Sequence, residues 1–158
     1  MQAGAAAPVA RSRANAERAM ALLRPTIEAI IADPAISPGG ALAIAVADSS
    51  RPDVPFDDAL LGCFTFGRTH AGAIDYERHA LDKARASHRG RADTSVVREH
   101  AAALLVEGLP FAGGVHRRGW SIGVSGAEPR YEEAIGAIAG ELLHALAAPH
   151  GLDSPRGE

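Results

Sequence analysis

Aromatic residues are scarce in this chain of 158 residues: phenylalanine, tryptophan and tyrosine together make up 4% of it, although 47% of its residues are hydrophobic. Much of the apolar content is therefore alanine, which buries little surface per residue. A chain of this length suits one domain of ordinary size. We expect its core to come from leucine, isoleucine and valine in the periodic segments, each contributing about 1.5–3 kcal/mol when fully buried.

Cysteine is almost absent, and Cys63 has no second cysteine with which to pair. This excludes an intramolecular disulfide and a cysteine-based zinc cluster. Its apolar neighbours predict a buried, inert thiol. No apolar run approaches the ~18 residues of a membrane helix, and residues 1–13 lack the basic-then-apolar order of a signal peptide. We therefore expect a cytoplasmic protein with no membrane partner.

Positive charge is not in excess either, because the formal net charge is −3. Proteins that bind nucleic acids usually carry a strongly basic face, so no nucleic-acid partner is expected. Two local basic clusters exist, one formed by Arg85, His88, Arg89 and Arg91 and the other by residues 116–118. Both are interpreted as solvated charge at the ends of helices and strands.

The hydrophobic pattern predicts four helices and four strands. A first helix, capped by Asn15 and interrupted or kinked at Pro25, has apolar residues at helical spacing up to Ile31. Short apolar runs predict two strands, joined by a loop over 51–58 that contains two prolines, and a tight turn at Arg118 and Gly119 predicts a hairpin later in the chain. The strands are expected over 41–47, 60–67, 114–117 and 120–125, and the remaining helices over 76–87, 95–107 and 130–146.

Strands that follow one another in pairs favour antiparallel neighbours over alternating strand–helix–strand units. The expected fold class is α/β of the α+β kind, with an antiparallel sheet of about four or five strands covered by helices. We expect a disordered lead over 1–13, a single domain over 14–148 and a flexible tail over 149–158.

Three blocks of sequence between residues 41 and 146 occur in the order typical of one known family. The first is IAVAD at 44–48, and the second runs from Arg68 to the ALDKA segment that contains Lys83. The third combines GGV at 113–115 with IGVSG at 122–126 and the acidic pair Glu132 and Glu133. With these motifs the chain resembles the haem-degrading/GlcG-type (HbpS-like, DUF336) family.

The resemblance implies a GlcG/HbpS-like layered sandwich around an antiparallel sheet, assembled as a homo-oligomer. Relatives are linked to haem binding or degradation and to cobalamin-associated enzymes, so haem is the implied cofactor. This chain departs from the family pattern at His70 and Ala71, where the family has Asp-Gly, and at Glu132 and Glu133, where it has Asp-Glu.

Lys83 is the first candidate site residue, because it matches the family lysine. A lysine whose stem is packed and whose ammonium faces a pocket can bind a carboxylate or propionate, and burial can lower its pKa for proton transfer. A surface lysine paired with Asp82 or Glu77 is the alternative. Glu132 and Glu133 either stabilise the dipole of the last helix or supply a general base.

The remaining candidates could hold an anion or a metal. Free N–H groups at Ser125 and Gly126 could hold an anion at the start of the last helix. Arg68 would meet propionates. His70 occupies a family motif position and could be an axial haem ligand, which makes it the candidate metal ligand, or an acid/base group. His116 is the second histidine of this kind.

Three functions stay open. The first is a small-molecule-binding protein for haem or a related tetrapyrrole. The second is a cofactor-independent isomerase or lyase, in which Arg68 or Lys83 anchors a carboxylated metabolite and His70 moves protons with Glu132 or Glu133. The third is a non-catalytic protein-interaction module. An anionic small molecule is the ligand expected in the first two.

Overall fold

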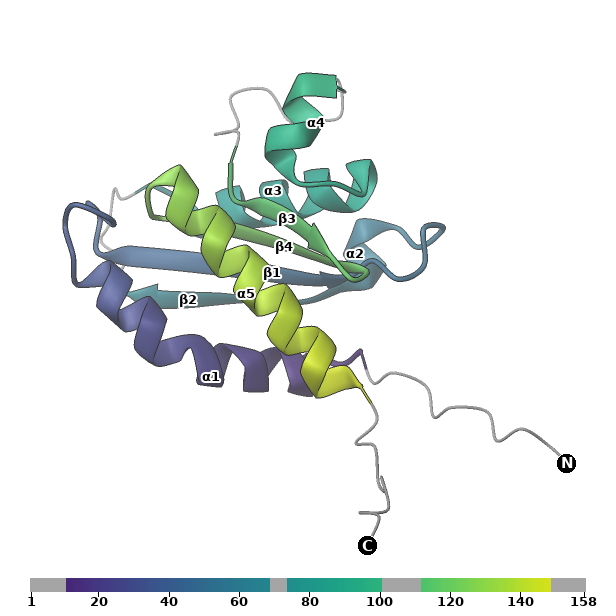
Figure 1. The fold of residues 1–158 in the computed structure, drawn as a ribbon, viewed down its shortest axis with the longest axis horizontal. Helices are drawn as coiled ribbons and strands as arrows, with labels where there is room; N and C mark the ends of the chain where they lie inside the picture. Colours follow the sequence, from purple (N-terminus) through teal and green to yellow (C-terminus); the bar gives the residue numbers. More distant parts are fainter. Residues whose placement is uncertain (1–10, 69–73, 101–111, 149–158) are drawn as a thin grey trace, which may run out of the picture.

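The computed structural model describes residues 11–68, 74–100 and 112–148 (Figure 1). These residues form five helices and one four-stranded sheet. In chain order the elements are α1 (Arg13–Ile31), β1 (Ala41–Asp48), α2 (Phe56–Ala59), β2 (Leu60–Gly67), α3 (Tyr76–Gly90), α4 (Thr94–His100), β3 (Gly114–Arg117), β4 (Trp120–Ser125) and α5 (Pro129–Ala147).

The sheet has the strand order β2-β1-β4-β3, and every pair of neighbours is antiparallel. The expected class, an antiparallel sheet covered by helices, is thereby confirmed. Arg118 and Gly119 join β3 to β4 with φ angles of 49° and 76°. Two consecutive positive φ values match the twist of antiparallel strands, so the expected hairpin turn is present. No helix among the described residues combines the length and apolar character needed to cross a membrane.

The two faces of the sheet differ in the size of their side chains. Large residues of β1 and β4, such as Ile44 and Val124, pack with α1 and α5 in one apolar cluster. The opposite face of β1 carries alanines, which pack with α2 and α3 in a second cluster. In Figure 1, α5 crosses one face of the sheet, with α1 beside it, and α3 lies behind the other face. Alanine is therefore the main buried side chain on the face that α3 covers.

Small residues let α3 lie very close to the sheet. A Cβ added to Gly123 of β4 would overlap the carbonyl oxygen of Ala80 and come 2.6 Å from the backbone nitrogen of Ala84. At Gly114 of β3, an added Cβ would lie 2.7 Å from the carbonyl oxygen of Lys83. The backbone of α3 is in direct contact with the strands, so the side chains that α3 carries reach beyond the sheet.

Several local expectations were wrong. Ser12, not Asn15, caps α1, because its hydroxyl accepts a hydrogen bond of 3.2 Å from the Asn15 N–H. The helix runs through Pro25 without beginning a second segment. The loop expected over 51–58 ends in the helical turn α2.

Arg11, which precedes α1, contacts residues at the turn between β3 and β4. The Arg11 guanidinium stacks over the Trp120 ring at 4.3 Å and donates to the Gly119 carbonyl at 2.9 Å. Helix α4 covers Thr94–His100, and the rest of the helix expected over 95–107 lies outside the described residues.

We predict that Gly123→Ala destabilises the protein by about 1–3 kcal/mol or more, because the new methyl group meets the α3 backbone, which cannot rotate away. Denaturant unfolding measures the change. Gly62→Ala in β2 is the matched control, since its methyl group would meet the movable ring of Phe64. Equal stability of Gly123→Ala and the unmodified protein would contradict the close packing of α3.

Candidate functional site

Lys83 is buried in the centre of the molecule, and 1% of the residue is exposed. Its ammonium donates to Glu132 Oε2 at 2.7 Å and to the Val124 carbonyl at 2.9 Å. Lys83 comes from α3 and Glu132 from α5, two helices that belong to the clusters on opposite faces of the sheet. The pair therefore ties the two helical layers together.

The other oxygen of Glu132 is also occupied. Oε1 accepts hydrogen bonds from the Gly126 N–H at 2.9 Å and from the Ala127 N–H at 3.3 Å. The anion-binding N–H groups expected near Ser125 and Gly126 are thus present, but the anion they hold is a carboxylate of the same chain. Ser125 lies beside them on β4 and is itself buried.

Lys83 and Glu132 leave no accessible head group for a ligand. Burial lowers the pKa of Lys83, and the negative charge of Glu132 acts in the opposite direction. The alternative, a surface lysine paired with Asp82 or Glu77, is wrong, because Lys83 is buried and its partner is Glu132. The roles of Lys83 and Glu132 as anion anchor or proton carrier stay predictions, and either role requires the pair to open.

The other charged candidates that the structure describes make different contacts. Glu133 accepts a hydrogen bond of 2.9 Å from the Ser95 hydroxyl and so joins α5 to α4. Arg68 follows β2 and is exposed. His70 lies outside the described residues, so its role as haem ligand or acid/base group stays a prediction. Among the described residues, no group of three or more histidine, cysteine or acidic side chains could hold a metal ion.

Cys63 is partly buried, whereas the sequence predicts a buried thiol. Burial, together with the negative charge of Glu77, raises the pKa of the Cys63 thiol to about 12. Since the thiolate is the nucleophilic form, Cys63 is unreactive at neutral pH. It is not a candidate nucleophile.

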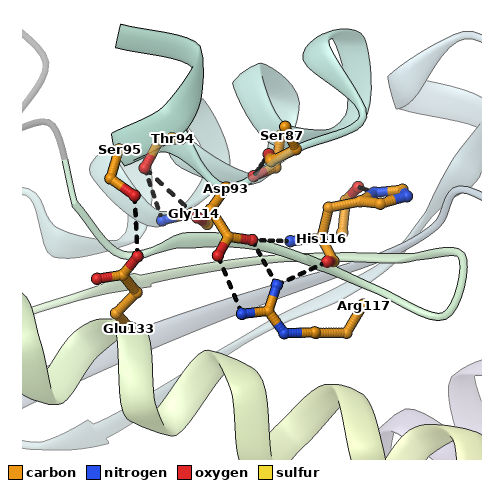
Figure 2. A network of polar contacts seen from close by, with 10 residues as sticks. Ser87, Asp93, Thr94, Ser95, Gly114, His116, Arg117 and Glu133 are labelled. Carbon is orange, nitrogen blue, oxygen red and sulfur yellow. Dashed lines mark hydrogen bonds and ion pairs between the residues drawn. The ribbon is translucent and has the colours of Figure 1, made fainter. Parts of the chain in front are cut away.

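His116 is held on β3 by a carboxylate from the link between α3 and α4. Asp93 accepts a hydrogen bond of 2.9 Å from the His116 backbone N–H, and its two oxygens receive the Arg117 guanidinium at 2.7 and 3.0 Å. Figure 2 shows this Asp93 clamp beside the hydrogen bonds of Thr94 to Gly114. The Asp93 side chain therefore ties the link between α3 and α4 to β3.

The imidazole of His116 is half-buried and points along the sheet face that α3 covers. Its Nδ1 lies 3.1 Å from Ser121 Oγ, a cross-strand neighbour on β4. Burial lowers the pKa of His116, and the nearby Arg91 lowers it further, while Asp93 opposes both effects. The ring is therefore neutral at pH 7.

A cavity of about 460 Å³ opens at the end of the sheet where β1 finishes. It lies between residues 52–57 and the C-terminal end of α3, whose residues Arg85, His88 and Arg89 line it together with Arg91. Its volume falls within the range of roughly 300–1,000 Å³ typical of small-molecule sites. None of the predicted site residues that the structure describes lines it.

The arginines of this cavity are unequally neutralised. Arg85 pairs with Asp82 at 3.0 Å and with Asp57 at 3.5 Å. Arg89 and Arg91 are exposed, and within the described part of the chain neither forms an ion pair with a carboxylate. Arg91 instead donates to the Ser49 carbonyl at 3.0 Å.

The basic cluster of Arg85, His88, Arg89 and Arg91 is the signal for this site in the sequence. The sequence alone indicates solvated charge at the end of a helix. Spacings of three and four residues place Arg85, His88 and Arg89 on neighbouring turns of one helix face. What the spacing does not reveal is that residues 52–57 fold over that face, because this contact joins segments about 30 residues apart.

Comparison with solved structures gives two matches to the fold. The crystal structure of Klebsiella pneumoniae protein ORFY, described as DUF336, superposes with a TM-score of 0.57 and 14% identity, covering 92% of this chain and 97% of that one. The crystal structure of HbpS gives a TM-score of 0.52 and 22% identity, covering 90% and 96%. No family model and no curated protein matches the sequence. The chain thus has the fold that its sequence motifs indicate.

We predict that Lys83→Met destabilises the fold by about 3–5 kcal/mol, because it leaves the buried charge of Glu132 uncompensated. The double variant Lys83→Met/Glu132→Gln should recover part of this loss, since neither charge remains. Denaturant unfolding of both variants provides the measurement. Glu141→Gln, which removes a half-exposed partner of Arg118, is the control and should change stability by less than about 1 kcal/mol. A small effect of Lys83→Met alone would show that the pair is not structural.

Proposed function

We propose that the protein binds an anionic small molecule in the arginine-lined cavity, with haem or a related tetrapyrrole as the first candidate. The observation that carries the proposal is that Arg89 and Arg91 face a cavity of about 460 Å³ without a carboxylate partner among the described residues. Guanidinium groups bind carboxylates and phosphates through two parallel hydrogen bonds, which gives both affinity and orientation.

The cavity suits a ligand with an apolar body and an anionic end. Pro52, Val54, Pro55 and Phe56 supply apolar surface on one side, and the arginines line the other. Two lining carboxylates, Asp53 and Asp57, stand against three arginines. The excess positive charge favours a carboxylate or phosphate over a cationic ligand.

The residues present fit the propionate groups of haem better than its iron. Arg89 and Arg91 can hold two propionates. His88 borders the cavity, but its Nδ1 lies 2.7 Å from Ser49 Oγ and its Nε2 lies 2.8 Å from the Val54 carbonyl oxygen. Both ring nitrogens are engaged, so His88 would have to lose a hydrogen bond to ligate a metal. The proposal therefore rests on recognition of the anionic groups.

The burial of the Lys83–Glu132 pair argues against the isomerase or lyase alternative. That reaction needs Arg68 or Lys83 as the anchor and Glu132 or Glu133 as a partner in proton transfer. Lys83 and Glu132 are buried and bonded to each other, and Glu133 is bonded to Ser95. The arginine-lined cavity needs no such rearrangement to admit a ligand.

We predict that haemin and iron-free protoporphyrin IX bind with similar affinity, because both carry the same two propionates. Arg89→Ala/Arg91→Ala should weaken both by about tenfold or more per arginine, since a hydrogen bond to a charged group contributes about 1.5–3 kcal/mol. Absorbance titration of haemin and fluorescence titration of protoporphyrin IX measure the two affinities.

Arg18→Ala/Arg24→Ala is the matched control, because it removes two exposed arginines from α1 and leaves the cavity intact. It should bind both porphyrins like the unmodified protein. Unchanged affinity in Arg89→Ala/Arg91→Ala would overturn the proposed site. If the protein bound haemin but not protoporphyrin IX, and His70→Ala abolished haemin binding, recognition would instead depend on the iron.

A further inference from the structure

Four polar side chains form a continuous buried chain beside the arginine-lined cavity. His88 Nδ1 lies 2.7 Å from Ser49 Oγ, Ser49 Oγ lies 2.7 Å from Ser121 Oγ, and Ser121 Oγ lies 3.1 Å from His116 Nδ1. Both serines are completely buried. Since no solvent reaches the hydroxyls, each must satisfy its hydrogen bonds within the chain.

The far nitrogen of His88 fixes the first proton. His88 Nε2 lies 2.8 Å from the Val54 carbonyl oxygen, and a carbonyl oxygen only accepts hydrogen bonds. His88 Nε2 therefore carries a proton. The state of the remaining nitrogen, Nδ1, then decides the direction of every other hydrogen bond in the chain.

When His88 is neutral, its Nδ1 accepts the proton of the Ser49 hydroxyl. Ser49 Oγ must then accept from Ser121, because its own single proton is committed. Ser121 Oγ in turn accepts from His116, which needs a proton on Nδ1. A neutral His116 is consequently the Nδ1–H tautomer, and its Nε2 is a bare proton acceptor.

When His88 is cationic, every hydrogen bond points the other way. His88 Nδ1 donates to Ser49, Ser49 donates to Ser121, and Ser121 donates to His116 Nδ1. A neutral His116 then carries its proton on Nε2. No hydrogen bond of His116 Nε2 occurs within the described residues, so this atom is the open end of the chain.

We infer that these four side chains are a proton relay in which the charge on His88 sets the tautomer of His116. An anion in the arginine-lined cavity would favour the charged His88 and convert His116 Nε2 from a proton acceptor into a donor. This last step rests on the proposed function, whereas the relay itself does not.

The proton count of the relay balances. A hydronium ion gives its proton to His116 Nε2 and becomes water, the proton of His116 Nδ1 moves to Ser121, the Ser121 proton moves to Ser49, and the Ser49 proton moves to His88 Nδ1. Both hydroxyls stay neutral, His116 stays neutral and His88 gains one positive charge. No oxidant, reductant or metal takes part.

Charged groups lie near both ends of the relay. Arg91, Asp93, Arg117 and His88 act on His116, and burial together with the nearby positive charges lowers the pKa of His116. His88 faces Arg85, Arg89 and Arg91 as well as Asp53 and Asp57 across the cavity. A bound anion would add negative charge on the His88 side alone.

Nitrogen-15 NMR of histidine-labelled protein tests the relay, because ring nitrogen shifts distinguish the two neutral tautomers and the cation. As the pH falls from about 9 to 5 and His88 becomes charged, we expect His116 to change from Nδ1–H to Nε2–H with the same midpoint. Retention of one His116 tautomer throughout the charging of His88 in the unmodified protein would overturn the relay.

Two variants test the path. Ser49→Ala and Ser121→Ala each break one link, so the His116 tautomer should no longer follow His88. Ser50→Ala is the control, since Ser50 is the exposed neighbour of Ser49 and should leave the coupling unchanged. If the His116 tautomer still followed the charge of His88 in both variants, the path through Ser49 and Ser121 would be wrong. If a variant fails to fold, the titration of the unmodified protein still tests whether the relay exists.

Protoporphyrin IX at constant pH separates the two proposals. Its addition should raise the charged fraction of His88 and the Nε2–H fraction of His116 together. Failure of the porphyrin to bind would count against the proposed function, while the pH titration would still decide the relay. Binding without a change in either histidine would overturn the coupling of the cavity to the relay.

Discussion

The close approach of α3 to the sheet is the constraint on which the rest of the structure depends. Glycine, alanine and serine occupy the sheet face that α3 covers, so the α3 backbone contacts the backbone of β4 at Gly123. A helix that lies this close can extend long side chains past the strands. Lys83 reaches Glu132 on the opposite layer in this way, and His88 reaches the buried hydroxyl of Ser49.

The same packing separates the buried ion pair from the proposed binding site along one helix. Near the middle of α3, Lys83 and Glu132 neutralise each other in a closed environment, and the Gly126 N–H completes the bonding of the carboxylate. Such a pair contributes little net stability compared with apolar packing, but it strongly penalises any arrangement that separates its members. At the C-terminal end of α3 the arginines face an open cavity instead.

Hydrophobic patterning was sufficient to predict the sheet. The apolar runs located all four strands, and the Arg118-Gly119 turn fixed the pairing of β3 with β4. Helix ends were less predictable, because Ser12 and Asn15 are both good capping residues and local sequence does not distinguish them. The structure brings the candidate residues Lys83, Gly126 and Glu132 together, but the sequence could not show that they satisfy one another's hydrogen bonds.

The relay and the cavity were not predictable from local pattern. Ser49 and Ser121 are 72 residues apart, and His88 is 39 residues from Ser49. Alternation along the strands gives a partial signal, since Ser121 and His116 are paired across β4 and β3. The alternation does not reveal which helix covers this face of the sheet. The hydrogen bond of Ser49 with His88 of α3 is therefore known only from the structure.

Amide chemical-shift mapping of the protein with protoporphyrin IX tests the central claim, that the ligand site lies at the C-terminal end of α3, most directly. The proposed site predicts that the largest shift changes occur in residues 52–57 and 85–91, which line the cavity. Changes centred instead on Lys83, Gly126 and Glu132 would contradict it and place the ligand at the buried ion pair.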